Sequence, residues 1–382
     1  MTSVYQGREQ TEAKHFILRR YLQTLAFKTL HGGWNTLAYI DGFSGPWQSR
    51  TVGHSDSSFM IALEVLKDAQ AKVRASGKRP RIKCFFSEEN RESYAQLQAA
   101  VAPHHDPANG FFIETFNGKF EDALGPIQRT MAGSFALTFI DPTGWKGYEF
   151  DKVRPIFEHA PGEVLLNFMY DFVSRFTASS DPKTLASFDG ILGQGWQQRL
   201  DPSLPREEGL MALFSEQFRK AGAFRYVLST PIEKIADRTH FHIVYGTRNP
   251  KGLEAYRQVE YDALKDHGMR RAAAREVLRE NKTGQTDLFG AAGAASVAEV
   301  SMEGQIAAIR LQAKEWLRHQ LPSCPKPFSD IWPMMLDNFA LRKTDAKDIC
   351  AELGKAGEIK ETWKLHSSRR RTPDDADQIE RA

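Results

Sequence analysis

The chain has 382 residues, 41% of them hydrophobic, with 51 basic and 48 acidic side chains and a net charge of +3, which fits about two folded domains. This balance permits a nucleic-acid partner without requiring one, and the three scattered cysteines argue against a disulfide framework or a cysteine zinc site. No apolar run approaches the roughly 18–20 residues that cross a bilayer, and the polar N-terminus has no signal-peptide core, so we expect a cytoplasmic protein without a membrane partner.

Helical and strand patterns alternate along the first half of the chain. The predicted helices are 11–30, 57–71, 92–101 and 120–131, and the predicted strands are 37–41, 81–87, 110–116, 134–140 and 163–169. Such alternation predicts a parallel sheet with right-handed crossovers. Strands 224–229 and 239–246 are too close for a helical crossover and suit an antiparallel edge hairpin. Residues 1–250 are therefore predicted to form a class I methyltransferase-like (Rossmann-type) α/β domain.

The remaining segments are polar or helical. Residues 171–222 form a predicted helical insertion after a strand's carboxyl end, either a cap over the cleft or surface decoration. Residues 251–310 are predicted to be a helical connector that ends in a flexible linker over 284–298. Residues 311–382 contain two helices, a glycine stop and a basic ribbon, which together outline a winged-helix domain.

The first predicted strand ends in a glycine-rich turn. Gly42 and Gly45, with Phe43 between them, allow a bulky ligand to approach the backbone. Asp41 is placed to accept a hydrogen bond from an ammonium group, directly or through water. Ligands of open α/β sheets bind at this edge, so the turn predicts a nucleoside-type cofactor.

The second and third strand ends supply polar acceptors. Glu88 is predicted to accept from two ribose hydroxyls, with a strand-capping surface acid as the alternative. Asn117 could accept from an adenine amino group.

The fourth strand end carries the predicted catalytic residues. Pro142 fixes the chain as it leaves the sheet and Gly144 permits an unusual turn, so Asp141 points into the cleft. Asp141 then either takes a proton from the methyl acceptor or caps the turn. Trp145 could stack on a base or form a wall, and Lys146 beside it is a predicted substrate contact.

The fifth strand end continues the same edge with predicted substrate contacts. Asn167 and Tyr170 lie there, and Arg175 could hold a substrate phosphate or pair with Asp171 four residues away. Two histidines on the last predicted strand lack a third ligand, so no metal site is predicted.

These segments together resemble the three-Cys-motif partner protein (TcmP) family, methyltransferase-like proteins with a C-terminal winged helix of the GMT-like type. The resemblance rests on Lys14 to Tyr21, Tyr39 to Pro46, Phe86 to Glu88, Phe139 to Gly147 and Leu165 to Phe176. It implies binding of S-adenosylmethionine and cooperation with a radical-type iron–sulfur partner protein, which itself suggests nucleic-acid modification or repair. The segment 53–58 is more polar than the family pattern, which puts the shape of the cofactor rim in doubt.

The predicted wing concentrates positive charge at Lys360, Lys364, Arg369, Arg370 and Arg371. The whole tail is nearly balanced in charge, which is poor for a free-standing DNA reader. Nucleic-acid contact through the wing and protein docking through the helix therefore both remain open. The leading hypothesis is an S-adenosylmethionine-dependent methyltransferase acting on nucleic acid, and the alternative is a catalytically degenerate adaptor that binds nucleic acid or protein for its partner.

Overall fold

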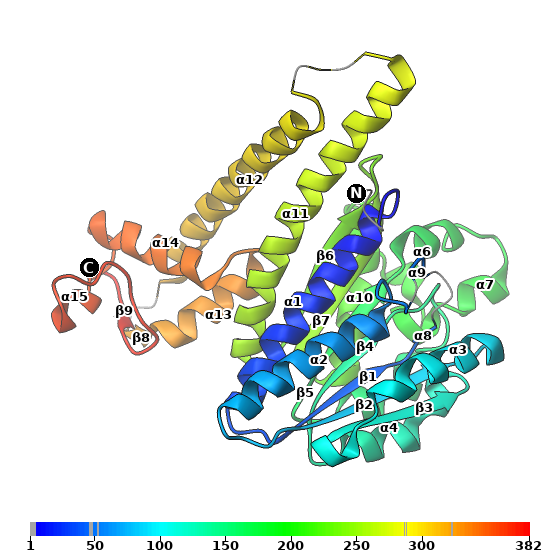
Figure 1. The fold of residues 1–382 in the computed structure, drawn as a ribbon. Coiled ribbons are helices and arrows are strands. Elements are labelled where there is room, and N and C mark those ends of the chain that lie inside the picture. Colours follow the sequence, from blue (N-terminus) through cyan, green and yellow to red (C-terminus); the bar gives the residue numbers. More distant parts are fainter. Residues whose placement is uncertain (1–4, 46–48, 52, 286, 288, 322–323) are drawn as a thin grey trace. The chain divides into compact units, whose positions relative to one another are not determined.

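Seven strands in the N-terminal half of the chain form one mixed sheet (Figure 1). The computed structural model describes residues 5–45, 49–51, 53–285, 287, 289–321 and 324–382, which divide into two units at Asn249/Pro250. The strands are β1 (Thr36–Asp41), β2 (Arg81–Glu88), β3 (Phe111–Asn117), β4 (Phe135–Ile140), β5 (Gly162–Phe168), β6 (Tyr226–Glu233) and β7 (Thr239–Thr247).

The strand order identifies the fold of the first unit. The sheet runs β3-β2-β1-β4-β5-β7-β6, in which β1 to β5 are parallel and β7 is antiparallel to both of its neighbours. A parallel sheet closed by a reversed edge hairpin is the arrangement of class I methyltransferases, so the predicted fold class is confirmed. The central strands are continuous apolar runs because helices cover both of their faces.

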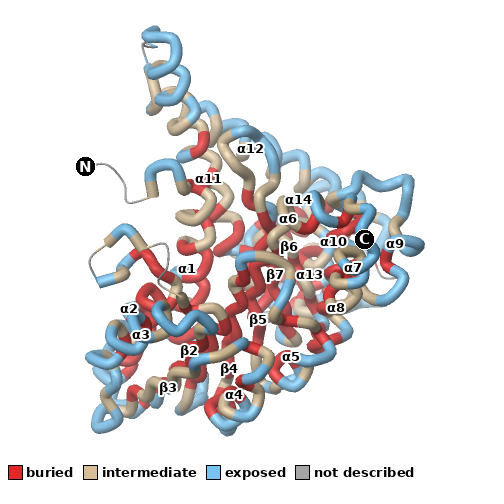
Figure 2. The backbone as a smooth tube through the Cα atoms, turned by 90° about the vertical axis from the view of Figure 1, so that its right-hand side faces the viewer, coloured by how far each residue is buried: buried red, intermediate tan, exposed pale blue. Residues whose placement is uncertain are grey.

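The helices of this unit are α1 (Glu9–His31), α2 (Ser58–Ala75), α3 (Arg91–Val101), α4 (Leu124–Met131), α5 (Phe150–Phe157) and α10 (Arg206–Gly222). Helix α1 packs with α2, and both α4 and α10 pack with α5. The apolar residues of α1 recur at helical spacing and are buried, for example Ile17, Tyr21 and Leu25. Figure 2 shows that burial is concentrated in the strands between these layers.

The predicted insertion consists of short helices between β5 and α10: α6 (Tyr170–Phe176), α7 (Pro182–Ala186), α8 (Asp189–Leu192) and α9 (Trp196–Arg199). Phe188, Ile191 and Trp196 are buried in the main core of the unit. The segment is therefore built into the core and is more than a surface decoration.

The second unit contains two long helices followed by a small helical region. Its elements are α11 (Pro250–Thr283), α12 (Gly290–Gln320), β8 (Lys326–Pro327), α13 (Phe328–Asn338), α14 (Lys343–Lys355), α15 (Trp363–His366) and β9 (Gln378–Ile379). Strands β8 and β9 pair antiparallel. None of the described helices combines the length and the apolarity that a bilayer crossing requires.

The predicted flexible linker over 284–298 is wrong for most of its length, because α12 begins at Gly290. The alanines of this segment are strong helix formers, and α12 packs along α11, where Lys265 Nζ lies 2.7 Å from Glu299 Oε1. The content of Gly, Ala, Ser and Thr suggested a linker, but the helix obtains its stability from packing along its neighbour, which composition does not reveal.

Candidate cofactor and active site

A cavity of about 760 Å³ lies at the carboxyl edge of the parallel strands. The ends of four strands line it, together with parts of α5 and of the inserted helices: Gly42, Phe43, Ser87, Glu88, Glu89, Gly118, Lys119, Phe120, Glu121, Thr143, Trp145, Lys146, Gly147, Glu149, Lys152 and Ser187. The volume falls within the range of about 300–1,000 Å³ that suits small ligands and cofactors. The predicted residues that meet here are Gly42, Phe43, Glu88, Trp145 and Lys146.

The turn after β1 is tied to its neighbouring strands. The Gly42 N–H donates to the Phe139 carbonyl at 3.1 Å, and Ser87 Oγ donates to the Gly42 carbonyl at 2.9 Å. A Cβ at Gly42 would lie 2.6 Å from a ring carbon of Phe120, so the glycine is required by a packed aromatic ring. Gly45 is outside the lining, and Pro46 lies outside the described residues.

Asp41 is fully buried and does not line the cavity. Its Oδ1 accepts from the Phe43 N–H at 3.1 Å and its Oδ2 from Ser58 Oγ at 3.0 Å. Burial raises the pKa of Asp41 to about 6, against the opposing effect of these hydrogen bonds. The carboxyl thus joins the turn to the start of α2, and the predicted hydrogen bond from an ammonium group, directly or through water, stays a prediction.

Glu88 lines the cavity at the end of β2, where its Oε1 accepts from the Asn90 N–H at 2.7 Å. Asn117 does not line it, because its Nδ2 donates to the backbone carbonyls of Glu88 at 2.9 Å and Glu89 at 3.2 Å. The Asn117 side chain therefore ties the end of β3 to the end of β2, which the prediction of an adenine contact did not include.

Glu121 is a cavity residue that the sequence analysis missed. Its Oε1 accepts from Lys152 Nζ at 3.2 Å, and its Oε2 is buried without a hydrogen-bond partner among the described residues. The acid lies in the turn after β3, four residues beyond Asn117, the predicted adenine acceptor. The available signal for Glu121 was that it follows the end of β3. The sequence did not show which residue of the turn reaches the cavity.

Trp145 forms a wall between the cavity and the inserted helices. Its Nε1 donates to Ser187 Oγ at 2.9 Å, and its ring stacks on Phe188 with centroids 4.8 Å apart. Lys146 is exposed, with its Nζ 5.9 Å from the Trp145 ring centroid. Of the two roles considered for Trp145, the structure provides the wall.

A second polar group, the Lys14–Asp141–Asn167 cluster, lies where β4 and β5 end. Lys14 Nζ is 2.5 Å from Asp141 Oδ2, and Asn167 Nδ2 donates to Asp141 Oδ1 at 2.6 Å. None of Asp141, Pro142 and Asn167 lines the cavity, and Pro142 is buried. Lys14 had no assigned role because it stands on α1, far from Asp141 in sequence, and only the fold brings the two together.

The other predicted substrate contacts at this edge, Tyr170 and Arg175, contact side chains of the protein itself. The Tyr170 ring packs edge-on against His242, with centroids 5.8 Å apart. Asp171 lies 2.7 Å from Lys234 Nζ and 4.0 Å from Arg175, whose side chain is 62% exposed. The ion pair predicted as the alternative for Arg175 is thus present at the limit of contact. No group of potential metal ligands occurs among the described residues.

The polar segment 53–58 has a structural explanation. Asp56 accepts from Arg8 at 2.9 Å, Ser49 Oγ at 2.6 Å, the Arg50 N–H at 2.9 Å and Thr51 Oγ1 at 2.9 Å. Burial alone would raise the pKa of Asp56, but these donors hold it well below its usual range. The carboxylate therefore anchors the described part of the rim loop to the start of α1.

Replacing Asp56 with asparagine is expected to lower the free energy of unfolding at pH 7 by about 2–3 kcal/mol, because hydrogen bonds to a charged acceptor are lost. Since the folded pKa is depressed, the wild-type advantage should shrink as the pH falls below about 4. Urea unfolding at pH 7 and pH 3 measures both effects. Asp68→Asn, which removes only an exposed ion pair to Lys72, is the control and should cost under about 0.5 kcal/mol. An equal cost for the two variants would contradict the anchoring role.

His15 should make folding sensitive to mild acid. Burial and the charge of Lys14 lower the pKa of His15 to about 3, while its Nδ1 lies 3.0 Å from the Tyr5 hydroxyl. The folded state then binds fewer protons than the unfolded state below pH 6.5, so stability falls by about 2 kcal/mol between pH 7 and pH 5. His15→Gln should flatten this slope in unfolding experiments, whereas His319→Gln, at an exposed position, should leave it unchanged.

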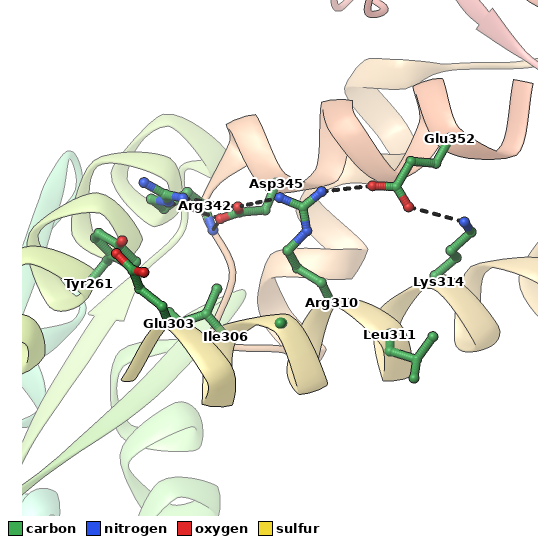
Figure 3. Close-up of a pocket in the computed structure, with 10 residues that line it drawn as sticks. Tyr261, Glu303, Ile306, Arg310, Leu311, Lys314, Arg342, Asp345 and Glu352 are labelled. Atoms are coloured by element: carbon green, nitrogen blue, oxygen red, sulfur yellow. Dashed lines mark hydrogen bonds and ion pairs between the residues drawn. The ribbon is translucent and has the colours of Figure 1, made fainter. Parts of the chain in front are cut away.

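The basic residues of the predicted wing are largely neutralised within the second unit. Lys360 pairs with Glu380 at 3.1 Å, Lys364 with Glu361, and Arg370 with Asp377 at 2.6 Å, whereas Arg369 and Arg371 are exposed. Figure 3 shows the same principle at α14, where Arg310 and Lys314 of α12 bind Glu352 and Arg310 also reaches Asp345. The positive ribbon read from the sequence is thus a set of ion pairs between residues of this unit, together with two exposed arginines.

Comparison with known proteins adds little to this geometry. No family model matches the chain, and no curated protein matches it either. A solved structure of a candidate methyltransferase from Thermobifida fusca YX aligns with 64% of this chain and 83% of its own, at 12% identity and a TM-score of 0.31. Loganic acid methyltransferase with SAH aligns with 70% of this chain and 86% of its own, at 10% identity and a TM-score of 0.28. Scores this low carry no argument, so the class I methyltransferase fold rests on the strand order.

Proposed function

We propose that this protein is an S-adenosylmethionine-dependent methyltransferase whose acceptor is a nucleic acid. The observation that carries the proposal is the cavity lined by the ends of β1, β2, β3 and β4, in a sheet with class I methyltransferase order. Ligands of open α/β sheets bind outside the carboxyl ends of the strands, which is where this cavity lies.

The lining provides partners for the nucleoside part of the cofactor. Glu88 accepts from the ribose hydroxyls at the end of β2. The buried Oε2 of Glu121, which has no hydrogen-bond partner in the part of the chain that the structure describes, accepts from the adenine amino group. The Phe43 and Phe120 rings, with centroids 5.9 Å apart, provide apolar contact. The cofactor supplies an activated methyl group, so the chain's residues mainly align the acceptor and exclude water.

Calorimetric titration of S-adenosylmethionine into the full chain tests the proposal. We expect saturable binding, together with transfer of labelled methyl from the cofactor to nucleic acid. Glu121→Ala should weaken binding roughly tenfold, because one hydrogen bond to a charged acceptor is lost. Absence of binding at millimolar cofactor would remove the proposal.

The acceptor and the protein partner rest on the resemblance to the TcmP family. Exposed Arg369 and Arg371 are the wing residues best placed to meet phosphates of DNA or RNA, if the region acts as a winged helix. A radical-type iron–sulfur protein is the proposed partner.

The Lys14–Asp141 ion pair favours a second candidate function. Asp141 is the predicted proton acceptor, and its carboxylate is already paired with the Lys14 ammonium. In that case the protein is a methyltransferase-like adaptor that presents nucleic acid to its partner. Intact cofactor binding without methyl transfer would favour the adaptor.

A further inference from the structure

The amino edge of the sheet, where β1 to β4 begin, carries a concentration of positive charge. Residues 67–83 run from the second half of α2 through the following turn into β2, and they contain seven basic residues against one acidic residue, Asp68. Their net charge of +6 is twice that of the whole chain, which is +3. The basic residues are Lys67, Lys72, Arg74, Lys78, Arg79, Arg81 and Lys83. Unless the protein itself neutralises it, such a surface attracts anions.

The protein neutralises little of this charge. Lys72 pairs with Asp68 at 2.7 Å, and no other of the seven has a carboxylate partner among the described residues. Lys78 Nζ donates to the His31 carbonyl at 2.8 Å, and this acceptor carries no net charge. The amino edge therefore differs from the predicted wing, where most of the cations are paired with carboxylates.

The dipole of α2 explains part of the pattern, because cations are favoured in the last turn of a helix. Lys72 and Arg74 stand in that turn. Lys78, Arg79 and Arg81 lie beyond the helix and are exposed, so the dipole does not account for them.

A cavity of about 330 Å³ lies at the same edge, between β2, β3 and α4. Three cations line it, Arg81, Lys83 and Arg129, and Glu114 is the one carboxylate of the lining. Glu114 Oε2 accepts from Thr130 Oγ1 at 3.0 Å. Burial and the charge of Arg81 lower the pKa of Lys83, so these cations destabilise one another. An anion placed between them relieves that repulsion.

An exposed aromatic side chain lies beside these cations. Trp34 is 41% exposed in the turn before β1, and the carbonyl of the next residue, Asn35, accepts from the Arg81 N–H at 2.8 Å. The Arg81 guanidinium lies 4.9 Å from the centroid of the Phe112 ring. Nucleic-acid bases stack on exposed aromatic rings, whereas the carboxylates of an acidic peptide do not.

We propose that this amino edge binds a single strand of nucleic acid, whose phosphates pair with Lys78, Arg79 and Arg81 while one base stacks on Trp34. The proposal rests on the nucleic-acid acceptor of the proposed function and assigns that acceptor a docking surface in the first unit. Since β2 has 8 residues, at about 3.3 Å each, the edge lies roughly 25 Å from the cavity at the carboxyl ends. A strand that reaches both therefore spans at least about eight nucleotides, at roughly 3.4 Å per nucleotide.

Fluorescence anisotropy of the full chain with a labelled single strand of about 30 nucleotides, without cofactor, tests the surface. Binding should weaken as NaCl rises from about 50 to about 200 mM, because phosphate contacts release counterions. Lys78→Gln combined with Arg79→Gln should weaken binding about tenfold at about 100 mM NaCl. The slope of log K against log salt should fall in magnitude by about 1.4, since each phosphate contact contributes about 0.7.

Further variants separate stacking from charge. Trp34→Ala should weaken the same binding about tenfold, whereas Trp34→Phe, which keeps an aromatic ring, should stay within about threefold of wild type. Lys282→Gln combined with Lys355→Gln, at exposed positions of the second unit, is the matched control and should change the affinity less than about twofold. All these variants should keep the wild-type Tm and the wild-type Kd for S-adenosylmethionine, which guards against a loss through unfolding.

Unchanged binding after Lys78→Gln with Arg79→Gln, or an equal loss in the lysine control, overturns the surface. A loss confined to Arg369→Gln combined with Arg371→Gln also overturns it and places the contact in the predicted wing. Equal binding of polyglutamate, with the same loss in the variants, assigns the edge to an acidic protein partner instead. Wild type that binds S-adenosylmethionine but no strand removes this surface and the nucleic-acid acceptor, and it leaves the methyltransferase class standing. Strand binding without cofactor binding keeps the surface and removes the methyltransferase.

Discussion

Replacing Glu88 with alanine is expected to weaken S-adenosylmethionine binding about 100-fold. The carboxylate lies in the cavity lining at the end of β2, where it would accept from both ribose hydroxyls. Each such hydrogen bond to a charged group contributes about 1.5–3 kcal/mol, so losing both costs about 3 kcal/mol at the lower end of that range, which corresponds to somewhat more than 100-fold in Kd. Calorimetric titration of the folded variant gives the ratio directly.

Its neighbour Glu89 provides the matched control. Glu89 is exposed at the cavity rim and carries the same charge, so Glu89→Ala should change the Kd less than threefold. If both variants bind alike, the effect of Glu88 is one of general charge, and the ribose assignment is wrong.

Replacing Gly42 with alanine should damage both stability and binding through a single methyl group. The new Cβ would lie 2.6 Å from a ring carbon of Phe120, which is only 2% exposed and cannot move away freely. Overpacking of this kind costs about 1–3 kcal/mol, and displacement of the ring narrows the cavity that both residues line. Thermal unfolding with and without cofactor should show a lower Tm and a loss of the shift that the cofactor produces.

Gly125→Ala is the control for this change. The added Cβ there would meet only Arg129 Nη1 at 3.6 Å, which is an ordinary contact, and it lies in α4, where alanine favours the helix. This variant should be at least as stable as wild type. Equal behaviour of the two alanine variants would show that Phe120 yields easily and that Gly42 has no special packing role.

The fold was accessible from sequence because its signals are local. Apolar runs such as Leu37 to Ile40 indicate buried parallel strands. The few residues between β6 and β7 indicate a hairpin. The prediction of a linker at 284–298 was wrong because the deciding interaction is not local. The helix there is stabilised by packing along α11, which a local pattern does not reveal.

The site was only partly accessible. Position after a strand identified Glu88 and the Gly42 turn, but it did not show that Asp41 turns inward or that Asn117 bonds the backbone. Lys14 and Asp141 meet across 127 residues, and no motif encodes that contact. Strand ends therefore predict where polar groups gather, while the direction of each side chain depends on partners distant in sequence.

The hydrogen bond from Trp145 Nε1 to Ser187 Oγ limits the side from which a ligand can enter the cavity. Because the indole is fastened to the inserted helices and stacked on Phe188, that side acts as a fixed back wall. The exposed members of the lining, Glu89, Lys119, Thr143 and Lys146, mark where the cavity opens to solvent. Cofactor and product then enter and leave past the acidic Glu89 and the basic Lys119 and Lys146. The rates of binding and release should therefore respond to ionic strength.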